Sequence, residues 1–526
     1  MKLKTLLFVV LASVATMAGA REANVFASGL MAFECDNGTN TDFMICYTLN
    51  APATSVTINI YQGETLVKTI ESSGLAKGYN EQAINLAGLS GEYTWSVKAT
   101  GEAWSEGETA TMVIDENNTA TLEGYMSPRG ITIDKDTESE FYGRIYVTET
   151  RNDVRNVGIY VYDAAFNDIT GQGNTAYNGN VAWGASSGCT RIFLNKDGKI
   201  YLSDWSDGHP GVWRADAFDL NADFVPVFGG TPNGDGLRFN EDEVAIAGSI
   251  PSCWVEGTGE NTVLYTFDED YINTNGNVQG VYQYNIGNLE QPWADAPSAI
   301  IYDNAENLHQ NGNSMIIPQN GGWWISQTRW TDGAAIPSLV YVKNNEVLFN
   351  SGAVDPEMIL RSYSSAICLF DEGTKLAVSS YNNIKIFEVT FDDAGVPSLS
   401  ELMNIDPALG QNCYSIAIDA AHNMYLAVDR ANASSTGNVG VFALPVPENV
   451  CETPAPSAQK LFVGGGTVVA GDVDGDGVAT AGDITALYNY LLNSDSSAIV
   501  NGDQDGDGTI TAGDITLVYN ILLGSN

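Results

Sequence analysis

The sequence predicts a mainly β protein, in which a β-sandwich is followed by a six-bladed β-propeller and a small α-helical domain. The first observation behind this is a series of short alternating strands between residues 23 and 115. The second is a sequence repeat of three apolar strands that occurs six times between residues 120 and 444, and such internal repeats are typical of propellers. The third is a pair of near-identical segments near the C-terminal end, each finishing in a helical apolar pattern.

Residues 1–20 have the features of a cleavable signal peptide. Lys2 and Lys4 precede an apolar run, and Ala18-Gly19-Ala20 supplies the small residues of a cleavage site. We therefore expect export, and a mature protein that is secreted or associated with the cell surface. No later stretch reaches the roughly 20 apolar residues of a membrane span. The formal charge of −42, or −44 without these two lysines, disfavours nucleic acid as a partner.

Residues 21–116 are predicted to form a β-sandwich. Apolar and polar residues alternate in short runs that Gly, Asn and Ser residues separate, and the clearest runs are Phe43–Tyr47, Ser55–Tyr61 and Gly91–Val97. The stretch YTLNAPATSVTINIYQGETLVKTI resembles the Ig-like module of flagellar hook-capping proteins. This resemblance implies an Ig-like spacer or packing domain.

Seven cysteines follow the expected cleavage site, and none shows CxxC spacing. A chain of this length can build its cores without disulfides, so we expect mostly buried thiols. A bridge between Cys35 and Cys46 across neighbouring strands stays open.

Residues 117–446 are predicted to form a six-bladed β-propeller, because each repeat supplies three strands in the same order. The first strands are Gly130–Ile133, Arg191–Leu194, Cys253–Val255, Met315–Ile317, Ala366–Leu369 and Ile416–Ile418. The second strands are Ile145–Val147, Ile200–Leu202, Val263–Tyr265, Trp323–Ile325, Leu376–Val378 and Met424–Leu426. The third strands are Ile159–Tyr162, Val212–Trp213, Val281–Tyr284, Leu339–Val342, Ile384–Phe387 and Val441–Phe442. The segments RGITIDKDTESEFYGRIYVTET and CTRIFLNKDGKIYLSDW are similar to the NHL-type propeller repeat.

Residues 447–469 have the composition of a linker. Prolines at positions 445, 447, 454 and 456 are followed by three consecutive glycines from Gly464. We therefore expect residues 470–526 to form a separate domain that reaches away from the propeller.

The two C-terminal segments, GDVDGDGVATAGDITALYNYLL and GDQDGDGTITAGDITLVYNILL, are related by an offset of 31 residues. Acidic residues stand at positions 1, 3, 5 and 12 of each loop, with glycine at position 6, which is the spacing of a calcium-binding EF-hand loop. Calcium prefers oxygen ligands, and alternating carboxylates on a curled loop converge on one point. The expected ligands of two calcium ions are Asp472, Asp474, Asp476, the carbonyl of Val478 and Asp483, then Asp503, Asp505, Asp507, the carbonyl of Thr509 and Asp514.

An amphipathic helix is predicted after each loop, from residue 484 to 492 and from residue 515 to 522. No helical pattern precedes either loop, so the arrangement resembles the duplicated half EF-hand of the dockerin type I family. This resemblance implies two helices held together by two calcium ions. It also implies a cohesin-like protein module as partner, in a polysaccharide-degrading system.

Positions 10 and 11 of the loops depart from the dockerin pattern. Well-known dockerins carry hydroxyl residues there and use them to recognise their partner. The partner-binding positions of this chain are Ala481, Gly482, Ala512 and Gly513. The identity of the partner therefore stays open, and docking within the same chain is an alternative.

The propeller region shows no recognisable catalytic constellation. Its three histidines, His209, His309 and His422, are far apart in the sequence and lack HExxH spacing. Calcium-dependent lactonases of this fold carry acidic groups where the innermost strands begin, and the corresponding residues here include no carboxylate: Arg129, Ser187, Pro251, Asn313, Ser365 and Tyr414. We therefore predict a non-catalytic binding protein. The alternative is a carbohydrate-active hydrolase or lyase, because two positioned carboxylates suffice for glycoside hydrolysis.

The loops after the second strands are expected to share one face of the propeller. Aromatic residues beside charged residues suit the recognition of a glycan or peptide. The residues predicted for this ligand face are Asp204, Trp205, Arg329, Trp330, Tyr381, Asp429 and Arg430, and the same loops carry Glu149, Arg151 and Asp268. Ordinary blade-rim residues, or a purely structural surface protein without a ligand, are the alternatives.

Overall fold

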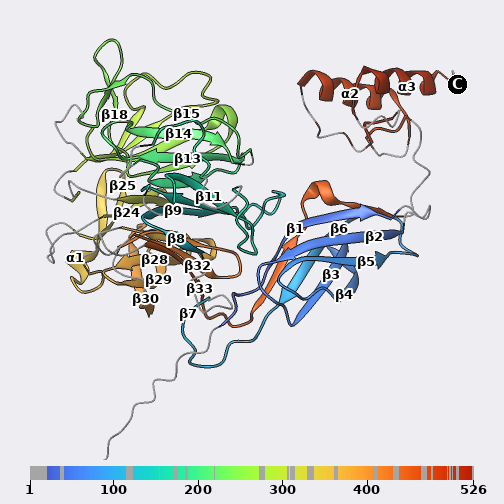
Figure 1. Ribbon diagram of the computed structural model, residues 1–526, viewed down its shortest axis with the longest axis horizontal. Coiled ribbons are helices and arrows are strands. Elements are labelled where there is room, and N and C mark those ends of the chain that lie inside the picture. The colour runs from blue at the N-terminus through green and yellow to red at the C-terminus, as the bar shows by residue number, and fades with distance from the viewer. Residues whose placement is uncertain are drawn as a thin grey trace, which may run out of the picture. The chain divides into compact units, whose positions relative to one another are not determined.

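The structure is a computed structural model. It describes residues 21–35, 41–113, 122–152, 155–170, 176–183, 188–217, 219–271, 279–304, 307–308, 314–327, 337–360, 365–407, 412–429, 437–463, 471–474, 478–493, 496, 499, 501–504 and 509–523, so the predicted signal peptide lies outside these ranges. Within them the protein is mainly β, with helices of 13 and 11 residues near the C-terminal end (Figure 1). The described ranges contain no helix with the length and apolarity of a membrane span.

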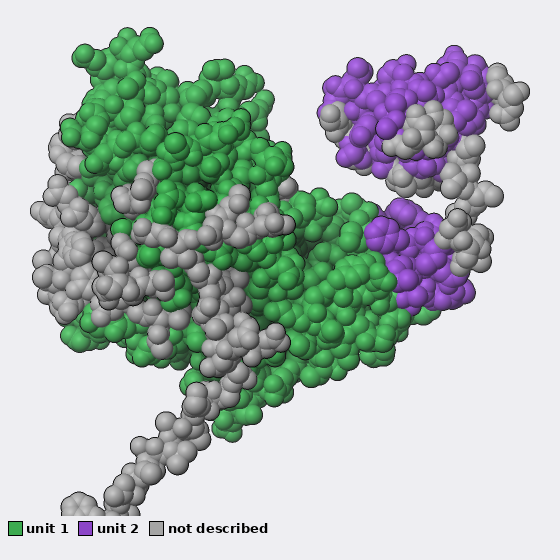
Figure 2. Space-filling view, in the orientation of Figure 1, with its two compact units in different colours: residues 1–31, 45–82, 95–459 green, residues 32–44, 83–94, 460–526 purple. Residues whose placement is uncertain are grey.

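The chain divides into two compact units (Figure 2). One contains residues 1–31, 45–82 and 95–459, and the other contains residues 32–44, 83–94 and 460–526. The sheets that fall in the predicted repeats belong to the first unit, and both long helices belong to the second.

Two sheets occupy the N-terminal region for which a sandwich is predicted. One has the strand order β1-β2-β5, and the other has the order β34-β6-β3-β4, with β35 also paired to β6. The strands from this region are β1 (Ala27–Glu34), β2 (Asp42–Leu49), β3 (Ser55–Gln62), β4 (Thr65–Ser72), β5 (Gly78–Asn85) and β6 (Gly91–Thr100). Alternate apolar residues are buried, such as Val56 and Ile58 in β3 and Trp95 and Val97 in β6, because successive side chains of a strand point to opposite faces.

The second of these sheets is completed by residues from the other end of the chain. β34 (Val450–Pro454) pairs antiparallel with residues 96–100 of β6, and β35 (Leu461–Val463) pairs antiparallel with residues 91–93. The prolines here suggested a linker over residues 447–469, but β34 lies at the edge of its sheet, where proline is tolerated. The structure therefore differs from the linker prediction across residues 450–463.

The side chain of Glu452 fastens β34 to this sheet. Its carboxylate accepts hydrogen bonds from Asn59 Nδ2 (2.9 Å), Tyr61 Oη (2.6 Å) and Ser96 Oγ (2.6 Å). The donors come from β3 and β6, so one carboxylate on the returning strand joins two strands of the N-terminal region.

The described residues from 128 to 443 form successive antiparallel sheets built from strands that follow one another in the chain. The first three repeats contain β9 (Pro128–Ile133), β10 (Ile145–Glu149), β11 (Gly158–Tyr162), β12 (Arg191–Leu194), β13 (Lys199–Asp204), β14 (Gly211–Asp216), β15 (Val225–Pro226), β19 (Ser252–Glu256), β20 (Val263–Asp268), β21 (Gly280–Tyr284) and β22 (Ala299–Tyr302). The last three contain β23 (Met315–Gln319), β24 (Gly322–Ser326), β25 (Leu339–Lys343), β26 (Glu346–Asn350), β27 (Ile367–Phe370), β28 (Lys375–Ser380), β29 (Asn383–Phe391), β30 (Pro397–Ile405), β31 (Asn412–Ile418), β32 (Asn423–Asp429) and β33 (Gly437–Ala443). Each strand predicted for the repeats overlaps one of these observed strands. A short additional sheet lies between the second and third repeats and contains β16 (Thr231–Pro232), β17 (Arg238–Phe239) and β18 (Ala245–Ala247).

The first strands of the six repeats contact one another in a closed ring. β9 contacts β12, β12 contacts β19, β19 contacts β23, β23 contacts β27, β27 contacts β31, and β31 returns to β9. Strands that precede the first repeat complete the last sheet, because β7 (Thr111–Met112) and β8 (Leu122–Tyr125) both pair with β33. The beginning and the end of the ring are thereby joined through backbone hydrogen bonds, which is how radial folds protect their edges.

Buried side chains fill the space between neighbouring sheets. Val147 and Tyr160 of the first repeat pack in one cluster with Tyr425 of the last. On the other side of the first sheet, Ile159 packs in one cluster with Leu202 of the second repeat. The second strands are apolar on both faces for this reason, which explains why they read as continuous apolar runs.

All seven cysteines are free thiols, so the bridge between Cys35 and Cys46 that the sequence left open is not formed. Five of the thiols are buried, and Cys35 and Cys451 are half-buried. Three of the buried thiols, Cys253, Cys368 and Cys413, lie on first strands of the ring.

Candidate functional site

Two helices follow the acidic loops: α2 (Ala481–Asn493) and α3 (Ala512–Leu522). Each places apolar residues at helical spacing on one side, and these stripes face a common small core. The buried members of this core are Val473, Ala486, Leu487, Ile515 and Val518. Because the core is so small, the two helices depend on the loops for much of their stability.

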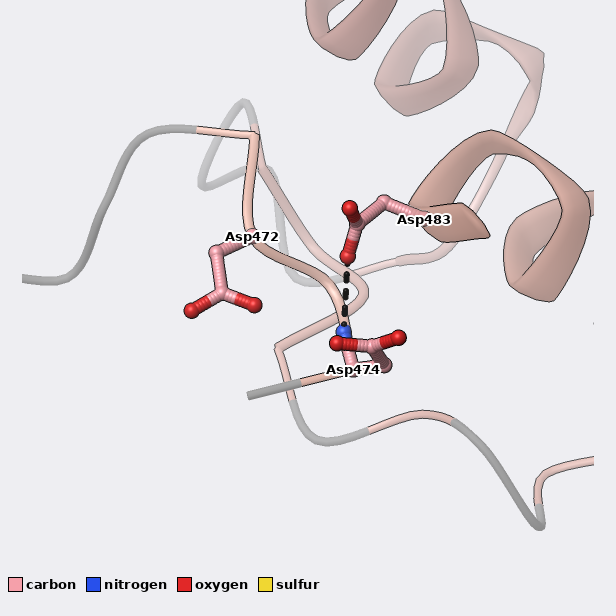
Figure 3. Close-up of side chains that lie close together, drawn as sticks. All are labelled: Asp472, Asp474 and Asp483. Carbon is pink, nitrogen blue, oxygen red and sulfur yellow. Dashed lines mark hydrogen bonds between the residues drawn. The ribbon is translucent and has the colours of Figure 1, made fainter. Parts of the chain in front are cut away.

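The first loop brings three carboxylates together (Figure 3). Oxygen atoms of Asp472, Asp474 and Asp483 lie within 4.8 Å of one another. Asp472 and Asp483 are buried, and Asp474 is half-buried. Asp483 stands at the start of α2 and accepts hydrogen bonds from the backbone N–H groups of Val473 (2.6 Å), Asp474 (3.0 Å) and Thr480 (2.7 Å). These bonds hold the loop against the helix.

The chemistry of this cluster suits a hard divalent cation. Burial alone raises the pKa of Asp483, but the backbone donors outweigh burial and bring the pKa below its ordinary value, so the carboxylate is ionised at neutral pH. Three close carboxylates repel one another unless a cation lies between them. Calcium prefers such oxygen ligands, so Asp472, Asp474 and Asp483 fit calcium and would hold it. A bound ion would neutralise their charge.

The second loop repeats this construction. Asp514 is fully buried at the start of α3 and accepts hydrogen bonds from the backbone N–H groups of Gln504 and Thr511, both at 2.7 Å. Thr511 and Asp514 form a capping box, in which each side chain satisfies a backbone donor of the first turn. Gln504 Oε1 also accepts a hydrogen bond from Gly471 N–H of the first loop (2.8 Å), so the two loops are joined directly.

The structure brings together three of the predicted calcium ligands and places Asp514 in the position equivalent to Asp483. Asp503 is half-buried, and Val478 and Thr509 are exposed. Three predicted ligands lie outside the described residues: Asp476, Asp505 and Asp507. The predicted partner-binding residues lie exposed at the first turns of α2 and α3: Ala481, Gly482, Ala512 and Gly513.

Thr511→Val removes the capping hydroxyl of α3 and keeps the shape of the side chain. We expect the calcium-loaded C-terminal domain to lose about 1 kcal/mol of stability, because a backbone donor of the first turn is left without its partner. Thermal melting followed by circular dichroism at 222 nm, a standard helix signal, measures this loss. Thr516→Val is the matched control, since Thr516 is exposed and its hydroxyl only bonds the carbonyl of Ala512 within the helix. Equal melting of the two variants would contradict the capping role.

Buried carboxylates end the second strands of the first three repeats: Glu149, Asp204 and Asp268 are fully buried. Each accepts hydrogen bonds from backbone N–H groups of adjoining loops. The donors are Met126, Ser127 and Arg151 for Glu149, Ser206 for Asp204, and Gly248, Asp270 and Tyr271 for Asp268. These three carboxylates hold loops in place. The sequence did not reveal this role, because a polar residue at the end of an apolar strand gives no sign of being buried.

The structure places the carboxylates predicted for the ligand face beneath the surface. Asp204 is fully buried, and Asp429 is 6% exposed and accepts hydrogen bonds from Ser127 Oγ (2.6 Å) and Arg129 Nη2 (3.2 Å). Trp205 is half-buried and donates its indole N–H to the Glu269 carboxylate. Tyr381 is half-buried, and Arg329, Trp330 and Arg430 lie outside the described residues.

Burial raises the pKa values of Glu149, Asp204 and Asp268 to about 7 each. In the unfolded chain these groups lose their protons near pH 4, so the folded state binds more protons between about pH 4 and about pH 7. We therefore expect the free energy of unfolding of the ring to fall as the pH rises from about 5 to about 8, by on the order of 1 kcal/mol per group. Urea unfolding followed by tryptophan fluorescence measures this, because eight of the ten tryptophans lie between residues 183 and 330, within the repeats, and residues 470–526 contain none.

Asp268→Asn provides the control for this pH dependence, because it removes one of the three titrating groups. The slope of stability against pH is expected to be shallower in this variant, whatever its absolute stability. A stability that increases between about pH 5 and about pH 8 would contradict the assignment.

Arg191 lies at the centre of the ring and was not singled out from the sequence. Its side chain donates Nε–H to the carbonyl of Tyr414 (3.0 Å), Nη1–H to the carbonyls of Pro251 (3.0 Å) and Ser314 (3.1 Å), and Nη2–H to that of Ser365 (2.7 Å). The four carbonyls lie at the starts of the first strands of four different repeats. Burial lowers the pKa of Arg191 to about 9, so the guanidinium is charged at neutral pH. The Arg191 side chain therefore connects β12 of the second repeat to the sheets of four other repeats.

Residues 470–524 match the family model of the dockerin type I domain. This match supports calcium as the ion of the acidic loops. No curated protein gives a significant match to the chain.

Solved structures resemble the chain only distantly. A proposed oxidoreductase (glucose dehydrogenase) from Thermus thermophilus is 10% identical, with a TM-score of 0.37, over 62% of this chain and 98% of that one. A protein from Lactobacillus plantarum is 13% identical, with a TM-score of 0.34, over 76% and 98% of the two chains. An auxiliary nutrient binding protein from Bacteroides thetaiotaomicron is 10% identical, with a TM-score of 0.37, over 78% and 96%. The strand pairing itself therefore defines the fold.

Proposed function

We propose that residues 470–526 are a dockerin module that binds two calcium ions and attaches this exported protein to a cohesin-like partner. The observation that carries this proposal is the duplicated loop. Three carboxylates converge within 4.8 Å at the start of α2, and Asp514 holds the same position in the first turn of α3 as Asp483 does in the first turn of α2. The match to the dockerin type I model over residues 470–524 supports the same assignment.

For the remainder of the chain we propose a six-bladed propeller of the NHL type preceded by an Ig-like sandwich. The closed ring of first strands supports six blades, and the pairing of β7 and β8 with β33 supports ring closure. The two sheets of the N-terminal region support the sandwich. After the repeats, the chain returns to this region, where β34 pairs with β6.

We propose that the propeller and the sandwich bind a ligand and do not catalyse a reaction. The buried carboxylates at the ends of the second strands accept backbone hydrogen bonds, which is a structural use of these groups. A glycan or peptide ligand is proposed for the face formed by the neighbouring loops, in keeping with a polysaccharide-degrading system. A hydrolase or lyase is the alternative function, and measurable cleavage of a polysaccharide by the purified protein would favour it.

Calorimetric titration of calcium into the chelator-treated protein tests the attachment role. We expect two tight sites and a gain of helical circular dichroism, because the small core around Leu487 and Val518 needs the ions. Immobilised cohesin modules should then retain the protein in calcium and release it in chelator. Heat of binding without a gain of helix, or no heat at all, would contradict the proposal.

A further inference from the structure

The centre of the ring contains a cavity of about 940 Å³. It is lined by residues of the first strands of all six repeats and by turns that follow three of these strands, Asp134–Thr137, Asn195–Lys196 and Gly257–Thr258. Lys135, Lys196 and Glu256 at this end are exposed, so the cavity opens to solvent here. We call this space the funnel.

Arg191 forms the inner end of the funnel. Arg191 lines the funnel, and its guanidinium group donates hydrogen bonds to the four carbonyls at the starts of the first strands. A charged group with several short hydrogen bonds stays in place, since releasing it would leave the carbonyls unsatisfied. Among the described residues, Arg191 therefore closes this end of the funnel.

The funnel and the predicted ligand face lie at opposite ends of the first strands. In the antiparallel register, Arg191 at the start of β12 stands opposite Ser203, next to Asp204 at the end of β13. Leu194 at the end of β12 stands opposite Ile200, near the start of β13. The loops after the second strands are thus at the Arg191 end, and the funnel opens at the other end.

The wall of the funnel is apolar and partly aromatic. Phe193 and Trp254 lie side by side with ring centroids 4.6 Å apart and planes tilted by 58°. Met315 and Leu369 complete an apolar wall, and all four side chains are half-buried although they lie on the innermost strands. Apolar surface that stays in contact with water inside a concave site of this size is typical of a small-molecule site.

We propose that the funnel binds a small apolar molecule that carries an aromatic ring, with the Phe193–Trp254 pair as the ring-contacting wall. The cavity volume is within the range of about 300–1,000 Å³ that ligand pockets of drug size occupy. Lys135 lies at the mouth, and its charge acts to lower the pKa of the Cys368 thiol in the wall, although burial keeps that pKa above its ordinary value. The exposed side chains of Lys135, Lys196 and Glu256 offer polar contacts at the mouth to one end of such a molecule. The site differs from the ligand face proposed above in both position and chemistry.

The neutral fluorescent compound N-phenyl-1-naphthylamine is a suitable probe, because its emission rises when it leaves water for an apolar site. We expect saturable binding to the full-length protein that chelator leaves unchanged, so failure of the calcium sites and failure of the funnel are distinguishable. Thr132→Trp places a bulky ring at a half-buried lining position and should weaken binding at least about tenfold. Thr65→Trp, on the exposed β4, is the matched control and should bind as the unchanged protein does.

Thiol labelling tests the same site without a substitution. Cys253 and Cys368 line the funnel and keep 9% and 7% of their surface exposed, so we expect slow but measurable labelling, whereas Cys35 is half-buried in the N-terminal region. With N-ethylmaleimide at mildly alkaline pH, the probe should slow the labelling of Cys253 and Cys368 and leave Cys35 unaffected, as read by peptide mass spectrometry. Binding without protection of these two thiols, equal binding by Thr132→Trp, or no saturable binding overturns the proposal.

Discussion

The double variant Asp472→Ala with Asp503→Ala is expected to lack the calcium-induced helix of the C-terminal domain at every calcium concentration. Helices of 13 and 11 residues are marginal in water on their own, and their shared core has five buried residues. We therefore expect the proposed calcium ions to supply a large part of the folding free energy of this domain. Removing the first carboxylate of each loop leaves too few oxygen ligands for tight binding. Far-ultraviolet circular dichroism during a calcium titration measures the loss.

A matched variant separates this effect from a general change in charge. Glu64→Ala with Glu71→Ala also removes two carboxylates, but from exposed positions around β4. We expect this variant to gain helix on calcium addition as the unchanged protein does. If the Asp472 and Asp503 variant reached the same helicity in calcium, the loops would not be the element that folds the domain.

Arg191→Met is expected to destabilise the ring by about 4 kcal/mol or more, which can be enough to prevent folding. Methionine has a similar length and no donors, so the carbonyls of Pro251, Ser314, Ser365 and Tyr414 all lose their partner. Each buried carbonyl left unsatisfied costs about 1–3 kcal/mol, and water entering from the funnel recovers part of that cost. The midpoint of urea unfolding, followed by tryptophan fluorescence, measures the change.

Arg214→Met is the control for this substitution. Arg214 lies on β14 and donates to the carbonyl of Asn288 at 3.3 Å in an exposed position. A surface change of this kind shifts stability by about 0.5 kcal/mol or less. Similar midpoints for the two variants would show that the central guanidinium contributes little, and the closed end of the funnel would need another explanation.

Strand positions were predictable because each repeat carries the signal locally. Runs such as Ile145–Val147 and Leu376–Val378 are buried on both faces, so their apolar character shows in the sequence itself. The calcium loops were predictable for the same reason, since ligand spacing is fixed within twelve residues. Both predictions depend on neighbours in the chain.

The features that sequence did not reveal depend on distant parts of the chain. β34 is a strand because residues 96–100 of β6 offer it an edge, whereas the prolines within it and on both sides of it are typical of a linker. Arg191 is central because four repeats direct carbonyls at one point, and no spacing within the sequence encodes that convergence. Asp204 and Asp429 follow apolar strands as surface residues often do, but neighbouring loops cover them.

The return of β34 to β6 determines how the molecule bears tension. If residues 470–526 anchor the protein as proposed, a pull on the rest of the molecule applies force to the chain near residue 470. That force meets β35 and β34 first, where backbone ladders with β6 and the three hydrogen bonds of Glu452 resist it. The ring lies before β34 in the chain and is closed on itself by β7 and β8. We therefore expect the pairing of β34 with β6 to resist this force before the ring is loaded.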